Sequence, residues 1–332
     1  MRDFRLLSGG RTSDLKLNAE LSIIIVNWNG GDLLRRTVES VVAAPPSLTY
    51  EVIVVDNASS DDSLALLRSG AAASALGARL RVFENSDNLG FGRANNQAFA
   101  QTTSPLLLLL NPDTEVTAGS IDRLVETLRS GARVGAAGPK LLNVDGSVQV
   151  SVWRNPPATW ELLLTGFRLH KLLPRRVRGG LFLAEHFDYA RRRAVGMLSG
   201  AAMLVRREVV EEVGGFDERF HMYGEDNEWC LRIKRAGWRL LFEPAAVVMH
   251  HGGASSLKRW ESLEKQRVQA EGYLLFLRRC LPRRRRVSLL AVSCLLLSFQ
   301  RAARRLTGRE RRDVEQTLRL FAADLRRALR GG

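Results

Sequence analysis

The sequence has few cysteines, no apolar leader segment and almost no net charge over most of its length. Its three cysteines are widely spaced and form no Cys-x-x-Cys pair: Cys230, Cys280 and Cys294. This spacing argues against a metal knuckle or a dithiol redox centre and favours a reducing compartment. Residues 1 to 20 carry seven charged side chains, which leaves no room for the apolar core of a signal peptide. We therefore expect a protein that is not secreted.

Most of the net charge of +15 lies in the C-terminal part of the chain. Residues 258 to 332 contain 20 Lys and Arg against 7 Asp and Glu, a net charge of +13, which leaves 30 against 28, or +2, for residues 1 to 257. Aromatic residues do not alternate with the arginines of this tail and no nucleic-acid-binding motif appears, so we expect no specific nucleic-acid partner.

Short apolar runs alternate with helical patterns in the first third of the chain. The runs predict strands at Leu21–Asn27, 51–56, Leu80–Glu84 and Leu106–Leu110, and the segments between them predict helices at 32–42, 60–67 and 93–100. Two further strands are expected at 196–205 and 245–249. This alternation predicts an α/β domain with a mostly parallel sheet.

Polar residues follow three of these predicted strands directly. Asn27, Asp56 and the pair Asn111 and Asp113 stand where ligands bind in parallel sheets, beyond the carboxyl ends of the strands. Asn and Asp are also common turn residues, and Asp56 could instead cap the helix that begins near Ser60. The repetition after three strands favours a binding edge.

The segment at 88–96 (NLGFGRANN) combines glycines with amides at the start of a predicted helix. Gly90 and Gly92 permit close backbone approach, and a helix N-terminus attracts phosphate through its free N–H groups. A plain glycine turn is the alternative. The third glycine of the dinucleotide-binding fingerprint is absent, which argues against a Rossmann dehydrogenase.

Seven segments in one order resemble family 2 of the glycosyltransferases, and most closely its bacterial rhamnosyltransferase-like members. They are VNWNG at 26–30, VVDNASSDDS at 54–63, NLGFGRANNQA at 88–98, LNPDTE at 110–115, GGFDERF at 214–220, GEDNEWCLR at 224–232 and HHGGASS at 250–256. The resemblance implies a GT-A nucleotide-diphospho-sugar transferase fold. It also implies the transfer of a sugar from a nucleoside diphosphate to an acceptor hydroxyl, with inversion at the anomeric carbon.

The resemblance also implies a donor site and a divalent cation, Mn²⁺ or Mg²⁺. Its nucleotide-sugar-binding residues would be Asn27, Asp56, Asn88, Gly90, Asn95, Asn111 and Asp113. Asp113 matches the last carboxylate of the D-x-D motif and would bind the cation, whereas Asn111 replaces the first carboxylate and leaves the contact of that residue open. Hard divalent cations prefer such oxygen ligands.

His250 is the second metal ligand that we expect, because it follows the predicted strand at 245–249. His251 is its neighbour, and alternation along a strand would turn the two side chains in opposite directions. A hydrogen-bonded core histidine is the structural alternative.

The general base would be Asp226, which matches the base of the family. Glu225, Asp226 and Glu228 stand together in the first turn of a predicted helix, where carboxylates are stabilised by the helix dipole in any case. The residues alone therefore do not select Asp226. Trp229 could pack under the acceptor sugar or in the core.

The sequence divides into an N-terminal tail at 1–20, a GT-A catalytic domain at 21–257 and a basic helical appendage at 258–332. The apolar run at 287–300 spans about 21 Å as a helix, which is shorter than a bilayer core. An amphipathic stripe follows, with Val314, Leu318, Phe321, Leu325 and Ala328. The appendage would either bind the inner membrane surface or pack on the catalytic domain or a second subunit.

The expected substrates follow from the resemblance. The donor would be thymidine diphosphate rhamnose, with a uridine diphosphate sugar as the alternative, and the acceptor a glycan or a polyprenyl-linked saccharide of cell-envelope polysaccharide synthesis. The region at 153–193, rich in Pro and Arg, could recognise the acceptor. We expect a cytoplasmic enzyme, peripheral on the inner face of the membrane. A catalytically silent GT-A assembly partner is the alternative that Asn111 favours.

Overall fold

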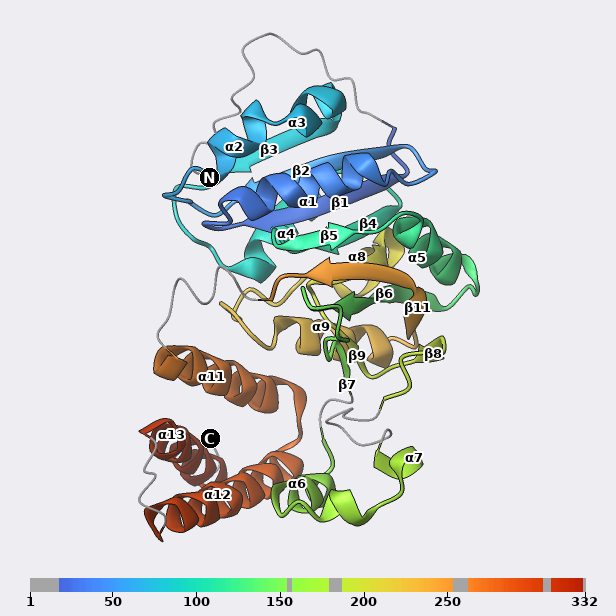
Figure 1. Cartoon of the computed structure of the whole chain (residues 1–332). Coiled ribbons are helices and arrows are strands. Elements are labelled where there is room, and N and C mark those ends of the chain that lie inside the picture. The colour runs from blue at the N-terminus through green and yellow to red at the C-terminus, as the bar shows by residue number, and fades with distance from the viewer. Residues whose placement is uncertain (1–17, 154–156, 179–186, 253–261, 307–311, 331–332) are drawn as a thin grey trace.

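A computed structural model describes residues 18–153, 157–178, 187–252, 262–306 and 312–330. Most of the expected N-terminal tail and part of the HHGGASS segment lie outside these residues. A nine-stranded sheet forms the body of the molecule, and α11, α12 and α13 lie together at one end, beside α6 (Figure 1).

The sheet is mixed, and six of its nine strands run in one direction. The strands of the main path are, in spatial order, β3 (Leu80–Glu84), β2 (Tyr50–Asp56), β1 (Leu21–Asn27), β4 (Leu106–Leu110), β10 (Ala202–Arg206), β6 (Val134–Leu142), β11 (Arg239–His250) and β5 (Thr114–Val116). β10, β5 and the short β8 (Arg193–Ala194), which pairs with β11, are antiparallel to their neighbours. The predicted strands β1 to β4 are confirmed.

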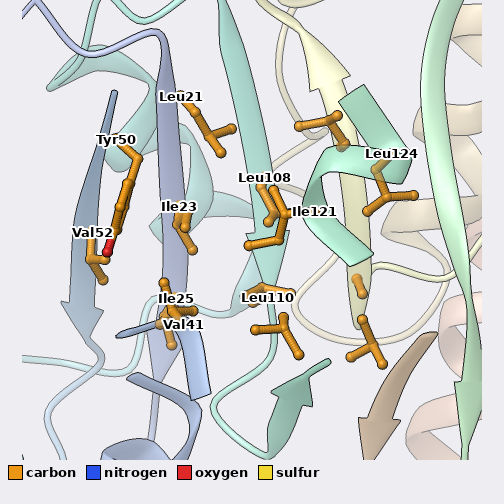
Figure 2. Packing of buried hydrophobic residues seen from close by; sticks show 14 of the residues in the cluster. Leu21, Ile23, Ile25, Val41, Tyr50, Val52, Leu108, Leu110, Ile121 and Leu124 are labelled. Carbon is orange, nitrogen blue, oxygen red and sulfur yellow. The ribbon is translucent and has the colours of Figure 1, made fainter. Parts of the chain in front are cut away.

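Alternate residues of each central strand face opposite layers of helices. Ile23 and Ile25 of β1 pack with α1 (Asp32–Ala43) and α5 (Ser120–Arg129), as Figure 2 shows. Ile24 and Val26 face α4 (Phe91–Ala100) and α9 (Glu225–Arg235). Because both faces are buried, the strands are apolar throughout, as is typical of covered parallel strands. Shorter helices complete these layers: α2 (Ser63–Ser69), α3 (Ala71–Leu76), the 3₁₀ turn η1 (Gly77–Arg79) and α8 (Arg207–Val213).

The predicted strand at 196–205 is divided in two, so this prediction was wrong in detail. β9 (Met197–Leu198) pairs with β7 (Val152–Trp153) in a separate two-stranded sheet, and β10 starts only at Ala202. Gly200 lies between them, and a Cβ at this position would lie 3.3 Å from the ring of Phe91. The chain changes sheets at the point where it passes the cavity described below.

Strand β11 is longer than the predicted segment at 245–249. Its pairing with β6 shifts between Glu243 and Val247. Pro244, which has no N–H to donate to the ladder, lies in this irregular stretch. The strand resumes at Val247 and carries His250 at its end.

Three long helices follow the sheet: α11 (Ser262–Cys280), α12 (Arg283–Leu306) and α13 (Arg312–Leu329). They enclose a third apolar core with Phe220, Leu274, Phe276 and Leu277. α12 also contacts α6 (Thr159–Gly166), which leads into the 3₁₀ turn η2 (Leu169–Leu172) and the short α7 (Arg175–Arg178). The helix over the predicted run 287–300 is therefore longer than expected, and by length and composition its segment Arg283–Ala303 could cross a membrane.

Candidate active site

A cavity of about 720 Å³ lies beyond the carboxyl ends of β1 and β4. The loop after β4, the end of β11, the start of α9 and one side of α11 contribute to its wall. Five of the residues expected from the sequence line it: Asn88, Asn111, Asp113, Asp226 and His250. The lining residues do not include Asn27, Asp56, Gly90 and Asn95.

Asp113 and His250 meet in one corner of the cavity. The Nε2 atom of His250 lies 3.3 Å from Oδ1 of Asp113 and 3.4 Å from Nδ2 of Asn111. The other ring nitrogen, Nδ1, lies 2.6 Å from Oε1 of Gln149. Because an amide oxygen only accepts, Nδ1 donates to Gln149, and in the neutral imidazole Nε2 is then the nitrogen with the lone pair that a metal ligand needs.

This corner fits a divalent cation. Two cis ligands of an octahedral ion, each about 2.1 Å from it, lie roughly 3 Å apart, which is close to the separation of Asp113 and His250. No group of three or more His, Cys, Asp or Glu side chains gathers as a metal site among the residues that the structure describes. A cation held here by Asp113 and His250 would need further ligands from outside the described side chains, and Mg²⁺ commonly takes such ligands from substrate phosphates and water.

His251 points away from this corner. Its Nε2 atom lies 2.7 Å from Oε1 of Glu115, and its backbone N–H donates to the carbonyl of Asp113 at 2.9 Å. Of the two adjacent histidines, His250 is the one on the cavity.

Asn27 and Asp56 lie behind the cavity wall and bind each other. Nδ2 of Asn27 donates to Oδ1 of Asp56 at 2.7 Å, and the same carboxylate accepts the backbone N–H and the hydroxyl of Ser59. Both side chains are buried. In this arrangement they hold the loop at 57–62, and the adjacent Trp28 and Asn57 reach the cavity in their place.

The glycines at 88–96 serve close packing. Gly90 has a φ of 86°, and a Cβ there would lie 2.6 Å from the carbonyl oxygen of His221. Asn95 donates to the carbonyl of Phe91, and Asn96 exchanges two hydrogen bonds with the backbone of Phe216. The segment therefore fixes the chain at 214–221, which leads to α9.

Two of the three acids at the start of α9 reach the cavity. Asp226 is half-buried, and its carboxylate accepts hydrogen bonds from the N–H groups of Asn227 at 2.8 Å and Gly200 at 3.4 Å. Burial raises the pKa of Asp226. Glu225 is 7% exposed, and burial together with the charge of Asp226 raises its pKa to about 8.

Glu228 and Trp229 turn away from the cavity. Glu228 forms an ion pair with Arg232 at 2.7 Å on the same helix. Trp229 is fully buried, packs against Phe216 at 4.4 Å between ring centroids and donates from Nε1 to the carbonyl of Gly214. Of its two sequence interpretations, the structure places it in the core.

Sequence reasoning missed the wall that α11 contributes. Lys265, Gln269 and Tyr273 line the cavity at intervals of four residues, so they share one side of that helix. Nothing in the local sequence marks them, because an i, i+4 repeat of unlike side chains is ordinary on any helix. The helix expected to begin a separate appendage therefore belongs to the site.

Comparisons with known proteins agree with this geometry. The family model described as "Glycosyl transferase family 2" matches residues 22–214, more than half of the chain. The chain belongs to glycosyl transferase family 2. A second model, "Glycosyl transferase family group 2", matches residues 176–304. The N-acetylglucosaminyl-diphospho-decaprenol L-rhamnosyltransferase of Mycobacterium tuberculosis is 32% identical over 251 residues, which cover 71% of this chain and 77% of that protein.

Solved structures of low sequence identity share the fold. The mannosyltransferase PcManGT of Pyrobaculum calidifontis, in complex with GDP-Man and Mn²⁺, aligns with a TM-score of 0.54 at 17% identity, over 95% of this chain and 76% of that one. TarS 1–349 of S. aureus, in complex with UDP-GlcNAc, aligns with a TM-score of 0.56 at 16% identity, over 93% and 81%. The predicted GT-A fold is confirmed, and the activity of this family 2 member is glycosyl transfer.

Proposed function

We propose that this family 2 enzyme is an inverting, cation-dependent transferase in which Asp226 is the general base. The observation that carries the proposal is the shared cavity, which joins the Asp113 and His250 corner to the carboxylate of Asp226. A leaving diphosphate and an attacking hydroxyl need two such groups, a cation and a base.

Different side chains would bind the cation and accept the proton. Asp113 and His250 would hold the cation, which when bound stabilises the negative charge on the leaving diphosphate. Asp226 would accept the proton of the acceptor hydroxyl as that oxygen attacks the anomeric carbon. The N–H groups of Asn227 and Gly200 fix its carboxylate. A direct displacement of this kind inverts the anomeric carbon.

The substrates that we propose are thymidine diphosphate rhamnose and a polyprenyl-linked diphosphosaccharide of the cell envelope. The support is the relative at 32% identity, whose name states rhamnosyl transfer to a diphospho-decaprenol-linked N-acetylglucosamine. The enzyme would act at the cytoplasmic face of the membrane, where such acceptors meet a soluble donor. If thymidine diphosphate rhamnose is not a donor, a uridine diphosphate sugar is the alternative.

The decisive experiment is a transfer assay with both donors and an N-acetylglucosaminyl-diphospho-lipid acceptor, with Mn²⁺, with Mg²⁺ and with a chelator. We expect Asp226→Asn to lower kcat by at least about 100-fold, in the range of a lost general base, while donor affinity measured by calorimetry is kept. Asp113→Asn should instead weaken cation-dependent donor binding. NMR of the first product should show the inverted anomer.

Four outcomes would contradict the proposal. Undiminished transfer by Asp226→Asn would show that Asp226 is not the base, and a retained anomeric configuration would exclude a direct displacement. Full activity in chelator would show that the reaction needs no cation. If no nucleoside diphosphate binds at all, the chain is a silent assembly partner.

A further inference from the structure

The exposed apolar side chains of the described chain are concentrated on two segments that are far apart in the sequence. Seven of the eleven large hydrophobic residues with exposed side chains lie on α12 or within the stretch from α6 to α7: Trp160, Phe167, Leu169, Leu172, Val177, Leu295 and Phe299. Figure 1 shows α6 and α12 side by side at the end of the molecule farthest from β3. Scattered apolar residues need no explanation, but a cluster on one face indicates an interaction surface.

Direct contacts join these two segments into one surface. Phe167 and Phe299 meet edge to face, with their ring centroids 5.6 Å apart. A Cβ at Gly166 would lie 2.5 Å from the side chain of Leu296, so this glycine lets the two helices approach closely. We call the set Trp160, Phe167, Leu169, Leu172, Leu295 and Phe299 the apolar face.

The two segments that form the apolar face carry exposed charges of one sign. Residues 162–178 contain five Lys and Arg and no Asp or Glu, and residues 283–306 contain seven arginines and no Asp or Glu. Arg168 and Lys171 are exposed between the apolar residues of the first segment, and Arg284 is exposed at the start of the second. On the neighbouring α13, Glu315 lies 3.7 Å from Arg301. The two segments that carry the apolar face are themselves cationic, which complements a bilayer with anionic headgroups.

We propose that the apolar face seats the enzyme on an anionic lipid bilayer, with α12 lying in the interface. α12 is long enough to span a bilayer, but it starts with four consecutive arginines. Leu289, Leu290 and Leu296 of this helix are buried within the protein. A helix with one side packed on the protein and one side exposed suits the plane of the interface. The proposal rests on this surface and not on the donor or acceptor.

Part of the region at 153–193 thus belongs to the proposed lipid-binding surface. The sequence indicated an acceptor-recognition segment there, whereas the described part at 159–172 packs on α12 and exposes its apolar side chains. The segment at 159–172 and helix α12 would then bind the lipid surface together, so that binding does not depend on the C-terminal appendage alone.

The test is vesicle flotation of the full-length protein and a triple variant, Phe167→Ser, Leu172→Ser and Phe299→Ser. The matched control is Val144→Ser with Leu329→Ser, because these residues are 64% and 58% exposed, as Leu172 and Phe299 are at 83% and 59%, but lie outside the apolar face. We expect wild type and control to float with phosphatidylglycerol-containing vesicles and the triple variant to lose about tenfold or more in partitioning. Circular dichroism checks that all three proteins are folded.

A second variant, with Arg168→Gln, Lys171→Gln and Arg284→Gln, tests the contribution of charge to vesicle binding. These changes should weaken binding to anionic vesicles and reduce its salt dependence, since each removes a cation near the surface. Pure phosphatidylcholine vesicles should bind wild type more weakly than anionic ones.

Three outcomes would overturn the proposal. Equal flotation of the triple variant would show that the apolar face does not bind lipid. If neither protein floats and light scattering shows a wild-type dimer against a monomeric triple variant, the face is an interface between two copies. If the bound protein resists an alkaline carbonate wash, α12 spans the bilayer.

Discussion

The proposed cation corner depends on a residue that does not touch the cation. Oε1 of Gln149 accepts a hydrogen bond from Nδ1 of His250, and Nε2 of Gln149 donates to Oδ1 of Asn143 at 3.0 Å. This chain of hydrogen bonds orients the imidazole ring so that its Nε2 atom faces Asp113. Loss of a partner that orients a metal-binding histidine typically lowers metal affinity by about 10- to 100-fold.

Gln149→Leu should therefore weaken the binding of Mn²⁺ in the presence of nucleoside diphosphate by about 10- to 100-fold. Isothermal calorimetry measures the affinity. Asn143→Ala, which removes only the second link of the chain, is the control and should have a smaller effect. Equal affinities of Gln149→Leu and wild type would show that Gln149 does not orient the histidine.

The buried carboxyl of Glu225 makes the stability of the enzyme depend on pH. Its pKa is raised from 4.5 to about 8 in the folded protein, so the folded state binds the proton more tightly than the unfolded state does. Stability should therefore be highest below the unfolded pKa and fall as the pH rises through the folded value.

Glu225→Gln should remove the contribution of this carboxyl to the pH dependence and leave that of Asp226, whose pKa is also raised by burial. Between pH 5 and about 8, the free energy of unfolding of the variant should change less with pH than that of wild type. Above that range the variant should be more stable than wild type, by an amount on the order of a few kcal/mol. Chemical denaturation at several pH values measures the difference. Parallel pH profiles of the two proteins would contradict the assignment.

The residue types of the site could be predicted, but not which of them face the ligand. Asn111, Asp113 and His250 line the cavity, as expected from strand ends. Asp56 also ends a strand but turns inward to Asn27 and Ser59. A side chain's direction after a strand depends on the loop that follows, which short-range patterns do not specify.

At the scale of the element, α9 is held in place by an aromatic cluster. Trp229 stacks on Phe99 and Phe216, and Asp226 stands one turn before it on the same helix. Trp229→Ala should cost about 3 to 5 kcal/mol of unfolding free energy, because it leaves a large cavity. Trp160→Ala, at an exposed position on α6, is the matched control and should change stability little.

A further variant, Trp229→Phe, tests the assignment of Trp229 to the core. Trp229→Phe keeps most of the apolar contact and should leave the acceptor KM near its wild-type value. A large rise in KM without a loss of stability would instead place Trp229 under the acceptor sugar.

The elements that local pattern predicts well are those whose apolar run and bounding turn residues are complete within the segment, even where the strands pair at long range, as β1 and β4 do. Strands β1 to β4 and the helices between them follow from apolar runs and turn residues close to each other in the chain. The division at Gly200 and the shift at Glu243 depend on β7, β6 and β10, which pair across long stretches of sequence. These details need the neighbours to be known.

At the scale of the whole molecule, the C-terminal helices are integrated with the catalytic core. Phe220, from the chain before α9, lies in the same apolar cluster as Leu274 and Leu277 of α11. A Cβ at Gly272 would lie 2.1 Å from the carbonyl oxygen of Tyr223, so α11 packs directly on the backbone that precedes the proposed base. The sequence division at 257 separates two charge compositions, but packing crosses it.

This packing predicts that residues 258–332 cannot be removed as a unit. A protein ending at residue 257 should expose the cluster around Phe220 and aggregate or lose its near-UV circular dichroism, because a large apolar surface becomes wet. The full-length protein should unfold in one calorimetric transition whose enthalpy matches the van't Hoff value. A second transition at lower temperature, together with a soluble and folded truncated protein, would show a detachable appendage. In that case the proposed base would be positioned without α11, and Lys265, Gln269 and Tyr273 could serve only the acceptor.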